Sequence, residues 1–144
     1  MKKKVKKQLK FGLIGQNIDY SFSRNYFSEK FKINHFANCE YRNYDIQSIS
    51  EFPKLINDSK GLAGLNVTIP YKEEIIPLLD KISKKAKKIG AVNCITISKN
   101  KKLKGYNTDY YGFKKTLEPL LKEHHKKALI LGTGGASKAV AYAL

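Results

Sequence analysis

The sequence predicts an α/β fold, a mostly parallel sheet with flanking helices, followed by the first strand–helix unit of a second domain. Two observations favour this class. Short apolar segments of strand length alternate with longer amphipathic segments, as in folds built from strand–helix–strand units. Near its end the chain passes from an apolar segment through a glycine-rich turn into a helix-compatible stretch that stops at Leu144. We therefore expect a first domain over residues 1–108, and a linker helix with the incomplete start of a second domain over residues 109–144.

The first elements follow from apolar runs and the residues that end them. Lys10–Gly15 is an apolar run that ends in glycine, which predicts a buried strand. After the polar loop Gln16–Ser23, the residues Tyr26, Phe27 and Phe31 recur at near-helical spacing. This spacing predicts a helix with one side in the core.

The next three elements continue the alternation. Ile33–Tyr44 alternates enough to predict a second strand. Ser48 or Ser50 can then cap a helix that runs through Ile56. Leu62–Leu65 predicts a third, short and buried strand.

Proline and glycine delimit the middle of the chain. Pro70 stops the third strand, and the residues from Tyr71 onward predict an amphipathic helix. Asp80–Ile89 predicts a second, strongly basic helical stretch, which Gly90 ends.

Two strands, a helix and a last strand complete the pattern. Ala91–Ser98 and Leu103–Tyr106 predict strands joined by a turn at Asn100-Lys101. Asp109–Glu123 predicts a helix, and Ala128–Leu131 predicts a short strand of the parallel type before the glycine-rich turn.

The chain is strongly basic. Its formal charge is +16, from 28 Lys and Arg against 12 Asp and Glu, and such a charge raises nucleic-acid binding as a first hypothesis. Only Arg24 and Arg42 are arginines, however, whereas base readout and bidentate phosphate contacts favour arginine. The lysines are scattered over predicted helix faces and turns, so a lysine-coated surface explains them, and we do not expect nucleic acid as the partner.

Cysteines, histidines and the first residues bear on location and metal binding. Cys39 and Cys94 lie far apart without metal-binding spacing, which is typical of reduced core cysteines in a cytoplasmic protein. The three histidines show no metal spacing either, so we expect no metal site. Residues 1–7 resemble the basic region of a signal peptide, but the following apolar run is interrupted at Gly15, too early for a signal core or a membrane span. We expect a frayed basic leader and no membrane segment.

Lys72 is the first candidate for chemistry. Lys72 follows Asn66-Val67-Thr68-Ile69-Pro70, so it comes after a strand, a polar Asn/Thr pair and a proline. At such a corner its ammonium group can face a cleft. Asp109 is its candidate partner, because a carboxylate that orients a lysine forms an acid/base pair suited to moving a proton to or from a hydroxyl. The alternative for Asn107-Thr108-Asp109 is a helix N-cap.

Other polar residues suit substrate binding, and each has a structural alternative. Ser21 and Ser23 bracket Phe22, so in extended backbone their hydroxyls project to one side and could grip a carboxylate. They could equally cap the helix that follows. Asn93 could donate to a substrate hydroxyl or satisfy a neighbouring loop.

The turn Gly132–Ser137 predicts a phosphate-binding loop. Gly132 permits a tight turn out of a strand, Gly134 lets the backbone approach a pyrophosphate, and the helix start offers amides and the positive end of its dipole. An ordinary strand–helix turn is the alternative, because Ser137 occupies the last position of the pattern G-x-G-x-x-G. The context favours the first unit of a Rossmann dinucleotide-binding domain.

Taken in order, these motifs resemble the N-terminal part of shikimate dehydrogenase. They are Phe11-Gly12-Leu13-Ile14-Gly15 with Ser21-Phe22-Ser23, Asn66-Val67-Thr68-Ile69-Pro70-Tyr71-Lys72-Glu73, Gly90-Ala91-Val92-Asn93, Gly105-Tyr106-Asn107-Thr108-Asp109 and Gly132-Thr133-Gly134-Gly135-Ala136-Ser137. The resemblance covers about Lys10 to Leu144. It implies an enzyme that uses NADPH to reduce 3-dehydroshikimate reversibly to shikimate, in the biosynthesis of chorismate and the aromatic amino acids.

The resemblance also implies a role for each matching residue. Lys72 and Asp109 would be the catalytic pair, with Lys72 as the acid. The substrate-binding residues would be Ser21 and Ser23 for the carboxylate, Thr68, Asn93 and Asp109 for the hydroxyls, and Asn66 and Lys72 beside them. The cofactor-binding residues would be Gly132, Thr133, Gly134, Gly135, Ala136 and Ser137.

Departures from the family pattern leave alternatives open. Arg24 stands where a proline is usual, Tyr110 where a glycine is usual, and Cys94 where a threonine is common. We expect Tyr110 to narrow the space beside the substrate, and the chain alone to lack turnover. The alternatives are a quinate/shikimate dehydrogenase paralogue and a non-catalytic, basic fragment that binds nucleic acid. NADP instead of NAD rests on the family alone, and the family permits monomers and homodimers.

Overall fold

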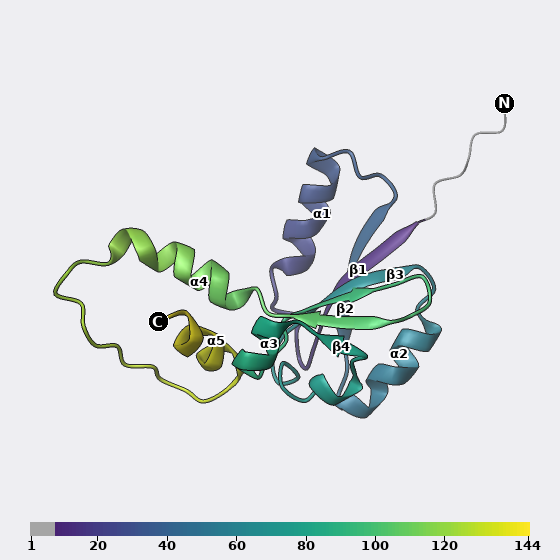
Figure 1. The fold of residues 1–144 in the computed structure, drawn as a ribbon. Coiled ribbons are helices and arrows are strands. Elements are labelled where there is room, and N and C mark those ends of the chain that lie inside the picture. Colours follow the sequence, from purple (N-terminus) through teal and green to yellow (C-terminus); the bar gives the residue numbers. More distant parts are fainter. Residues whose placement is uncertain (1–7) are drawn as a thin grey trace.

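A six-stranded sheet forms the centre of the computed structural model, which describes residues 8–144 (Figure 1). The strands are β1 (Leu9–Gly15), β2 (Cys39–Asp45), β3 (Leu62–Val67), β4 (Lys81–Ile82), β5 (Cys94–Ile97) and β6 (Leu103–Tyr106). Their order across the sheet is β2-β1-β3-β5-β6-β4. Both β2 and β3 are parallel to β1, β4 is parallel to β6, and β5 is antiparallel to β3 and β6. The predicted fold class is confirmed, whereas the leader expected over residues 1–7 lies outside the described residues.

Helices cover both faces of this sheet. They are α1 (Ser23–Ile33), α2 (Phe52–Asp58), α3 (Lys84–Ile89), α4 (Asp109–Leu117) and α5 (Gly135–Ala143), with the short 3-10 helices η1 (Ile49–Glu51), η2 (Ile76–Leu78) and η3 (Glu118–Leu120). In Figure 1, α1 stands on one face and α2 on the other, while α5 packs against α4 and α3. Of the two serines predicted as caps, Ser48 begins η1, in a full capping box with Glu51.

Alternation along β1 divides the core into two parts. On the α1 side, Leu13 packs with Ile18 and Tyr41. On the α2 side, Ile14 packs in one cluster with Phe52. Ile14 and Phe52 are fully buried, and burial of one such side chain contributes roughly 1.5–3 kcal/mol. The sheet is therefore fixed from both faces, which gives the loops at its edge a rigid support.

Two predicted helices differ from those observed. The segment from Tyr71 forms turns that lead into η2 instead of an amphipathic helix. Pro77 has no N–H to donate to the carbonyl of Glu73, so an α-helix that begins at Tyr71 cannot continue past this residue, and the carbonyl of Glu73 instead accepts the N–H of Ile76 at 3.1 Å. The basic stretch predicted from Asp80 is split, because Lys81–Ile82 pairs as β4 and Ser83 then caps α3 through the N–H of Ala86 at 3.1 Å.

Other strand and helix boundaries differ from the prediction, because hydrogen-bonding and packing partners determine where an element begins and ends. The strand predicted from Ile33 begins at Cys39, since α1 continues through Ile33, and the strand predicted from Ala91 begins at Cys94. The helix predicted from Asp109 to Glu123 ends at Leu117 and continues only as η3, which contains Pro119.

The strand predicted over residues 128–131 is not formed. Leu129 and Leu131 are 85% and 87% exposed, and no other strand of the described residues pairs with this segment. A strand needs a hydrogen-bonding neighbour, so an apolar sequence alone does not produce one. Within residues 8–144, none of the helices has the length and apolar character needed to cross a membrane.

Candidate functional site

Several predicted site residues meet at one edge of the sheet. The parallel strands β1 and β3 end there with Gly15 and Val67. Because β3 and β6 are both antiparallel to β5, they run in the same direction, so Thr68 after β3 and Asp109 after β6 reach the same edge. Asn93 lies there too, just before the oppositely directed β5. Carboxyl ends of parallel strands are where open α/β sheets bind ligands.

Lys72 and Asp109 form an ion pair at this edge. Nζ of Lys72 lies 2.7 Å from Oδ2 of Asp109, and the two side chains are 15% and 34% exposed. The carbonyl of Lys72 accepts the N–H of Val92 at 2.7 Å, which ties the lysine backbone to the segment that enters β5. The structure therefore brings the two residues together in a charge-assisted hydrogen bond that solvent reaches only in part.

Asn93 holds the second oxygen of Asp109. Its Nδ2 donates to Oδ1 of Asp109 at 2.6 Å and to Oγ1 of Thr108 at 2.9 Å. Its Oδ1 accepts the N–H of Thr108 at 2.8 Å and the hydroxyl of Thr108 at 3.2 Å. Asn93 is buried, and its whole hydrogen-bonding capacity is used. These bonds satisfy the neighbouring loop, which is one of the two roles left open by the sequence.

The carboxylate of Asp109 is not a helix cap, although α4 begins at this residue. Its two oxygens are bound by Lys72 and Asn93, and α4 has no side-chain hydrogen bond from its N-cap residue. The bond nearest to a cap comes from Asn107, whose Oδ1 accepts the N–H of Tyr110 at 3.3 Å. The cap alternative is therefore wrong for Asp109.

Ser21 and Ser23 lie together at the start of α1. Their Oγ atoms are 3.2 Å apart, and Oγ of Ser21 also accepts the N–H of Ser23 at 3.3 Å. The loop that carries them is fixed by Asp45 at the end of β2, whose carboxylate accepts the N–H groups of Asn17 and Ile18, each at 3.0 Å. The two hydroxyls are thus close together, but not through the extended backbone that was expected, because Phe22 between them has helical φ and ψ and Ser23 is the first residue of α1.

Asn66 and Thr68 lie on either side of the end of β3. Oδ1 of Asn66 accepts a hydrogen bond from the hydroxyl of Tyr41 at 2.8 Å. The N–H of Thr68 donates to the carbonyl of Ile14 at 2.9 Å, which extends the β1–β3 ladder by one residue. A Cβ on Gly15 would lie 2.5 Å from Cγ2 of Thr68, so this close approach requires glycine.

The start of α5 lies directly against Lys72. A Cβ on Gly135 would lie 2.8 Å from Cβ of Lys72 and 3.1 Å from Cβ of Ala91. Lys138, one turn along α5, forms an ion pair with Glu73. The backbone of Gly135 in the glycine turn is therefore in contact with the side chain of Lys72, the candidate acid.

The glycine turn has the features of an anion site. Gly132 has φ +118°, a conformation that favours glycine. Gly134 is the N-cap of α5 and offers no side-chain cap, and a Cβ there would meet nothing within 4 Å. The N–H groups in the first turn of this nine-residue helix are thus open to an anion such as a pyrophosphate.

Tyr110 faces two helices. Its hydroxyl accepts a hydrogen bond from Nζ of Lys85 on α3 at 2.6 Å, and its ring meets Tyr142 of α5 edge-on at 5.3 Å. Its ring packs against the buried cluster that contains Ile89 and Ala139. These contacts join α3, α4 and α5, and none of them reaches Lys72 or Asp109.

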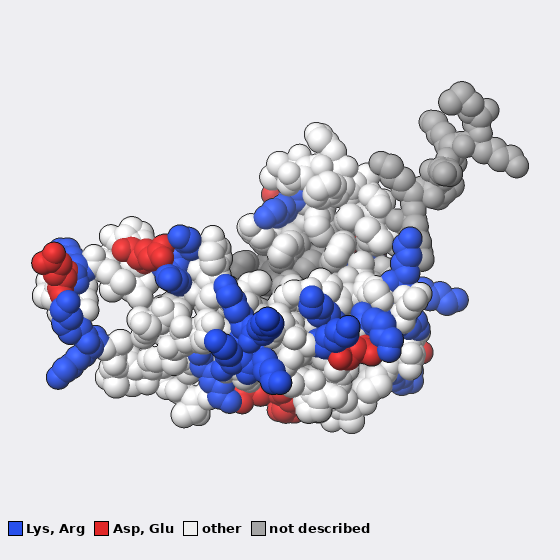
Figure 2. Space-filling model, in the orientation of Figure 1, with Lys and Arg blue, Asp and Glu red and all other residues white. Residues whose placement is uncertain are grey.

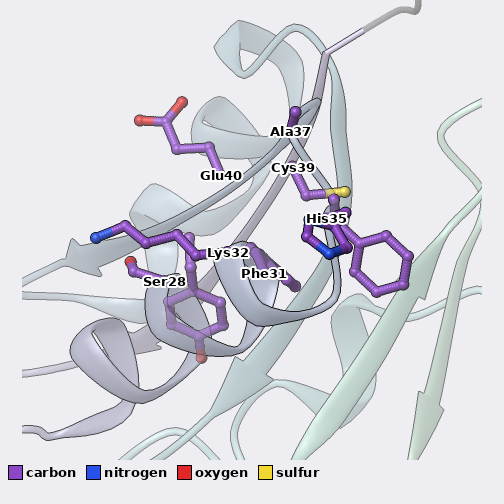
Figure 3. Close-up of a pocket in the computed structure, with 9 residues that line it drawn as sticks. Ser28, Phe31, Lys32, His35, Ala37, Cys39 and Glu40 are labelled. Carbon is purple, nitrogen blue, oxygen red and sulfur yellow. The ribbon is translucent and has the colours of Figure 1, made fainter.

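Two of the hollows in the described part of the chain lie between α1 and the sheet. One, between α1 and β2, has a volume of about 480 Å³, and its lining includes Phe31, Lys32, His35, Cys39 and Glu40 (Figure 3). It contains none of the predicted site residues. The other has a volume of about 340 Å³, is largely apolar, and includes Asn66 in its lining. Residues 8–144 hold no cluster of three His, Cys, Asp or Glu side chains arranged for a metal ion.

Lysines gather around α3 on the face shown in Figure 2, where blue side chains cover this helix and the neighbouring strands. Lys84, Lys85, Lys87 and Lys88 on α3 are all exposed. Positive charge near a site raises the local concentration of anions.

Three supporting residues were missed by the sequence reasoning. Tyr41 and Asp45 lie four positions apart in β2, so their even spacing could have placed both on one face of a strand, although it could not have named their partners. The sequence around Lys138 did not indicate its ion pair, because its partner Glu73 lies 65 positions earlier.

A family model matches more than half of the chain. Residues 13–95 match the model described as "Shikimate dehydrogenase substrate binding domain". The curated relative "Shikimate dehydrogenase (NADP(+))" of Aquifex aeolicus is 49% identical over 110 residues, which cover 74% of this chain and 40% of the relative.

Solved structures agree with this match. Shikimate dehydrogenase 1 of Peptoclostridium difficile is 42% identical with a TM-score of 0.84, over 94% of this chain and 50% of that one. The enzyme of Thermus thermophilus, solved in complex with NADP(H) and shikimate, is 31% identical with a TM-score of 0.81, over 94% of this chain and 51% of that one. The chain spans about half the length of these relatives.

Proposed function

This chain belongs to the shikimate dehydrogenase family through its substrate-binding domain, and from that premise we propose that it supplies the substrate site and catalytic pair of an NADP-dependent enzyme that interconverts 3-dehydroshikimate and shikimate. The observation that carries the proposal is the ion pair of Lys72 and Asp109, held by Asn93 beside the start of α5. We assign residues 1–108 to the substrate-binding domain and residues 109–144 to the linker helix and the start of the cofactor domain.

Lys72 is the proton donor in this proposal. Reduction of a ketone leaves negative charge on the oxygen as hydride reaches the carbon, and an ammonium at hydrogen-bonding distance stabilises that oxygen and protonates it. Asp109 keeps Nζ in one position through its 2.7 Å bond. In the reverse direction the same nitrogen takes the proton from the hydroxyl.

The remaining polar residues bind and orient the substrate. Ser21 and Ser23 bind its carboxylate through their paired hydroxyls, while Thr68 and Asp109 bind its hydroxyls. The side-chain amide of Asn66 lies beside these substrate-binding residues. Asn93 acts mainly by holding Asp109, because a substrate hydroxyl would have to share one of the hydrogen bonds that Asn93 already makes.

The cofactor is proposed as NADP, in line with the NADP(+)-dependent relatives. When bound, it supplies or accepts the hydride. Gly132, Thr133, Gly134, Gly135, Ala136 and Ser137 would hold its pyrophosphate, and the open N–H groups of α5 fit this group. Contact between Gly135 and Lys72 keeps this loop beside the proton donor.

Titration of the ¹⁵N-labelled chain with shikimate tests the proposal. Amide signals near Ser21, Thr68, Lys72 and Asp109 should shift. Lys72→Ala should weaken binding about tenfold or more, the range expected when a hydrogen bond to a charged group is lost. Lys87→Ala is the matched control, since Lys87 is an exposed lysine on α3, and it should bind like the unmodified chain.

The other outcomes discriminate between the alternatives. A folded chain that ignores shikimate, or equal affinities for the two lysine variants, would contradict the proposal. Stronger binding of quinate than of shikimate would assign the site to the quinate-using paralogues. Steeply salt-dependent binding of an oligonucleotide, without any response to shikimate, would favour the basic nucleic-acid-binding fragment.

A further inference from the structure

The side chain of Asn66 has two chemically different ends, and only one of them suits an oxygen-rich anion. Oδ1 accepts hydrogen bonds and Nδ2 donates them, so the end that faces the site decides whether Asn66 attracts or repels a substrate oxygen. In the structure Oδ1 is taken by the hydroxyl of Tyr41 at 2.8 Å. The side-chain hydrogen bond of Asn66 within residues 8–144 thus uses Oδ1, and the residue is only half-buried, so Nδ2 is the end available to a ligand.

Tyr41 is itself held firmly. It is 5% exposed, and its ring stacks on Phe27 of α1 with centroids 4.5 Å apart and planes 13° from parallel. It also packs with Leu13 and Ile18. Burial raises the pKa of its hydroxyl, and the nearby thiol of Cys94 adds to the rise, so the group stays protonated and able to donate at neutral pH.

The bond between Tyr41 and Asn66 crosses a whole strand. β2 and β3 lie on either side of β1, where Tyr41 is in register with Phe11 and Asn66 with Leu13. A buried side chain on the edge strand therefore reaches over β1 to the end of β3. No hydrogen bond of the site described above depends on Tyr41 except this one.

We propose that Tyr41 is a positioning residue for substrate binding, which holds the carboxamide of Asn66 with Nδ2 turned toward the site so that it donates to a carboxylate or hydroxyl oxygen of the substrate. The inference rests on the proposed function, because the ligand is the same small hydroxy acid. Without the hydroxyl of Tyr41, the carboxamide is free to rotate and present its oxygen to the anion.

Tyr41→Phe tests this directly, because it keeps the stacked ring and removes only the hydroxyl. The dissociation constant of the 144-residue chain for shikimate, measured by calorimetric titration, should rise about threefold to tenfold, as expected for one lost hydrogen bond between neutral groups. The matched control is Tyr44→Phe, the same chemical change three positions along β2 on its opposite face. This control should leave the dissociation constant unchanged.

A double-mutant comparison separates positioning from a general structural effect. If Tyr41 acts through Asn66, then Tyr41→Phe should cause no further loss of affinity in an Asn66→Ala background. Equal losses in both backgrounds, or an affinity of Tyr41→Phe equal to that of the unmodified chain, would overturn the inference alone. Failure of the unmodified chain to bind shikimate would instead defeat the proposed function and this inference with it.

Discussion

Gly135→Ala probes the contact between the glycine turn and the proposed acid. The added methyl would lie 2.8 Å from Cβ of Lys72 and 3.1 Å from Cβ of Ala91, whereas carbon atoms in good contact are about 3.5–4.0 Å apart. One side must therefore move by roughly 0.7 Å or more. Ala91 is fully buried, and the carbonyl of Lys72 is bonded to Val92, so neither neighbour can yield easily.

The expected result is a less stable chain with a displaced lysine. Overpacking of this kind costs about 1–3 kcal/mol, which lowers Tm by roughly 3–12 °C for a chain of this length. Thermal unfolding followed by circular dichroism measures the loss. The amide signal of Val92, which donates to the carbonyl of Lys72 at 2.7 Å, should shift as the lysine backbone moves.

Gly134→Ala is the control for this experiment. A Cβ on Gly134 would meet nothing within 4 Å, and its extended backbone is compatible with alanine, so this neighbouring change should cost about 1 kcal/mol or less as an altered N-cap. Alanine in the first turn of a free helix is more stable than glycine. A Gly135→Ala variant as stable as the original chain, with the Val92 signal unmoved, would therefore refute the packing of α5 against Lys72.

Three further changes have definite expected outcomes. Gly112→Ala, at an exposed position of α4 where a Cβ meets nothing within 4 Å, should raise the free energy of unfolding in urea by about 0.5–1 kcal/mol. Ser48→Ala removes the capping box of η1 and should lower it by about 0.5–2 kcal/mol in the same assay. The N–H of Leu103, followed by Lys102, lowers the pKa of Asp80. A carboxyl with a lowered folded pKa stabilises the fold above its unfolded pKa and loses this effect as pH falls through the folded value. Asp80→Asn should therefore lower Tm at pH 7, and the difference from the original chain should shrink progressively as pH falls below about 4; an undiminished difference at about pH 2 would contradict this assignment.

The sequence predicted the elements whose signal is local. The buried run that became β1 was recognised from its apolar residues and its final glycine, and the start of α4 from Asn107, Thr108 and Asp109. After Pro70 the apolar pattern suggested a helix, but Pro77 interrupts the hydrogen bonds that such a helix needs. The run before Gly132 has the composition of a strand but no neighbour to pair with in the described residues.

The sequence indicated the residues of the candidate site better than it indicated the hydrogen bonds between them. Lys72 and Asp109 were paired because their chemistry is complementary, and the structure has them 2.7 Å apart. The saturated carboxamide of Asn93 and the support from Tyr41 were not predictable, since both depend on which strands lie side by side. Sequence spacing carries no information about such contacts across a sheet.

The antiparallel hairpin of β5 and β6 has a consequence for how the site assembles during folding. Asn93 and Asp109 are 16 positions apart, Lys72 and Asp109 are 37 apart, and Glu73 and Lys138 are 65 apart. The entropy lost on closing a loop grows with its length, so the hairpin can set the carboxylate in place before the more distant lysine arrives. The ion pair that Lys138 of α5 makes with Glu73 requires the longest closure of the three. Among the helices and strands of the described residues, we therefore expect amide hydrogen exchange to be slowest in β5 and β6 and fastest in α5, an order of local stability that lets the glycine turn open while the ion pair of Lys72 and Asp109 stays intact.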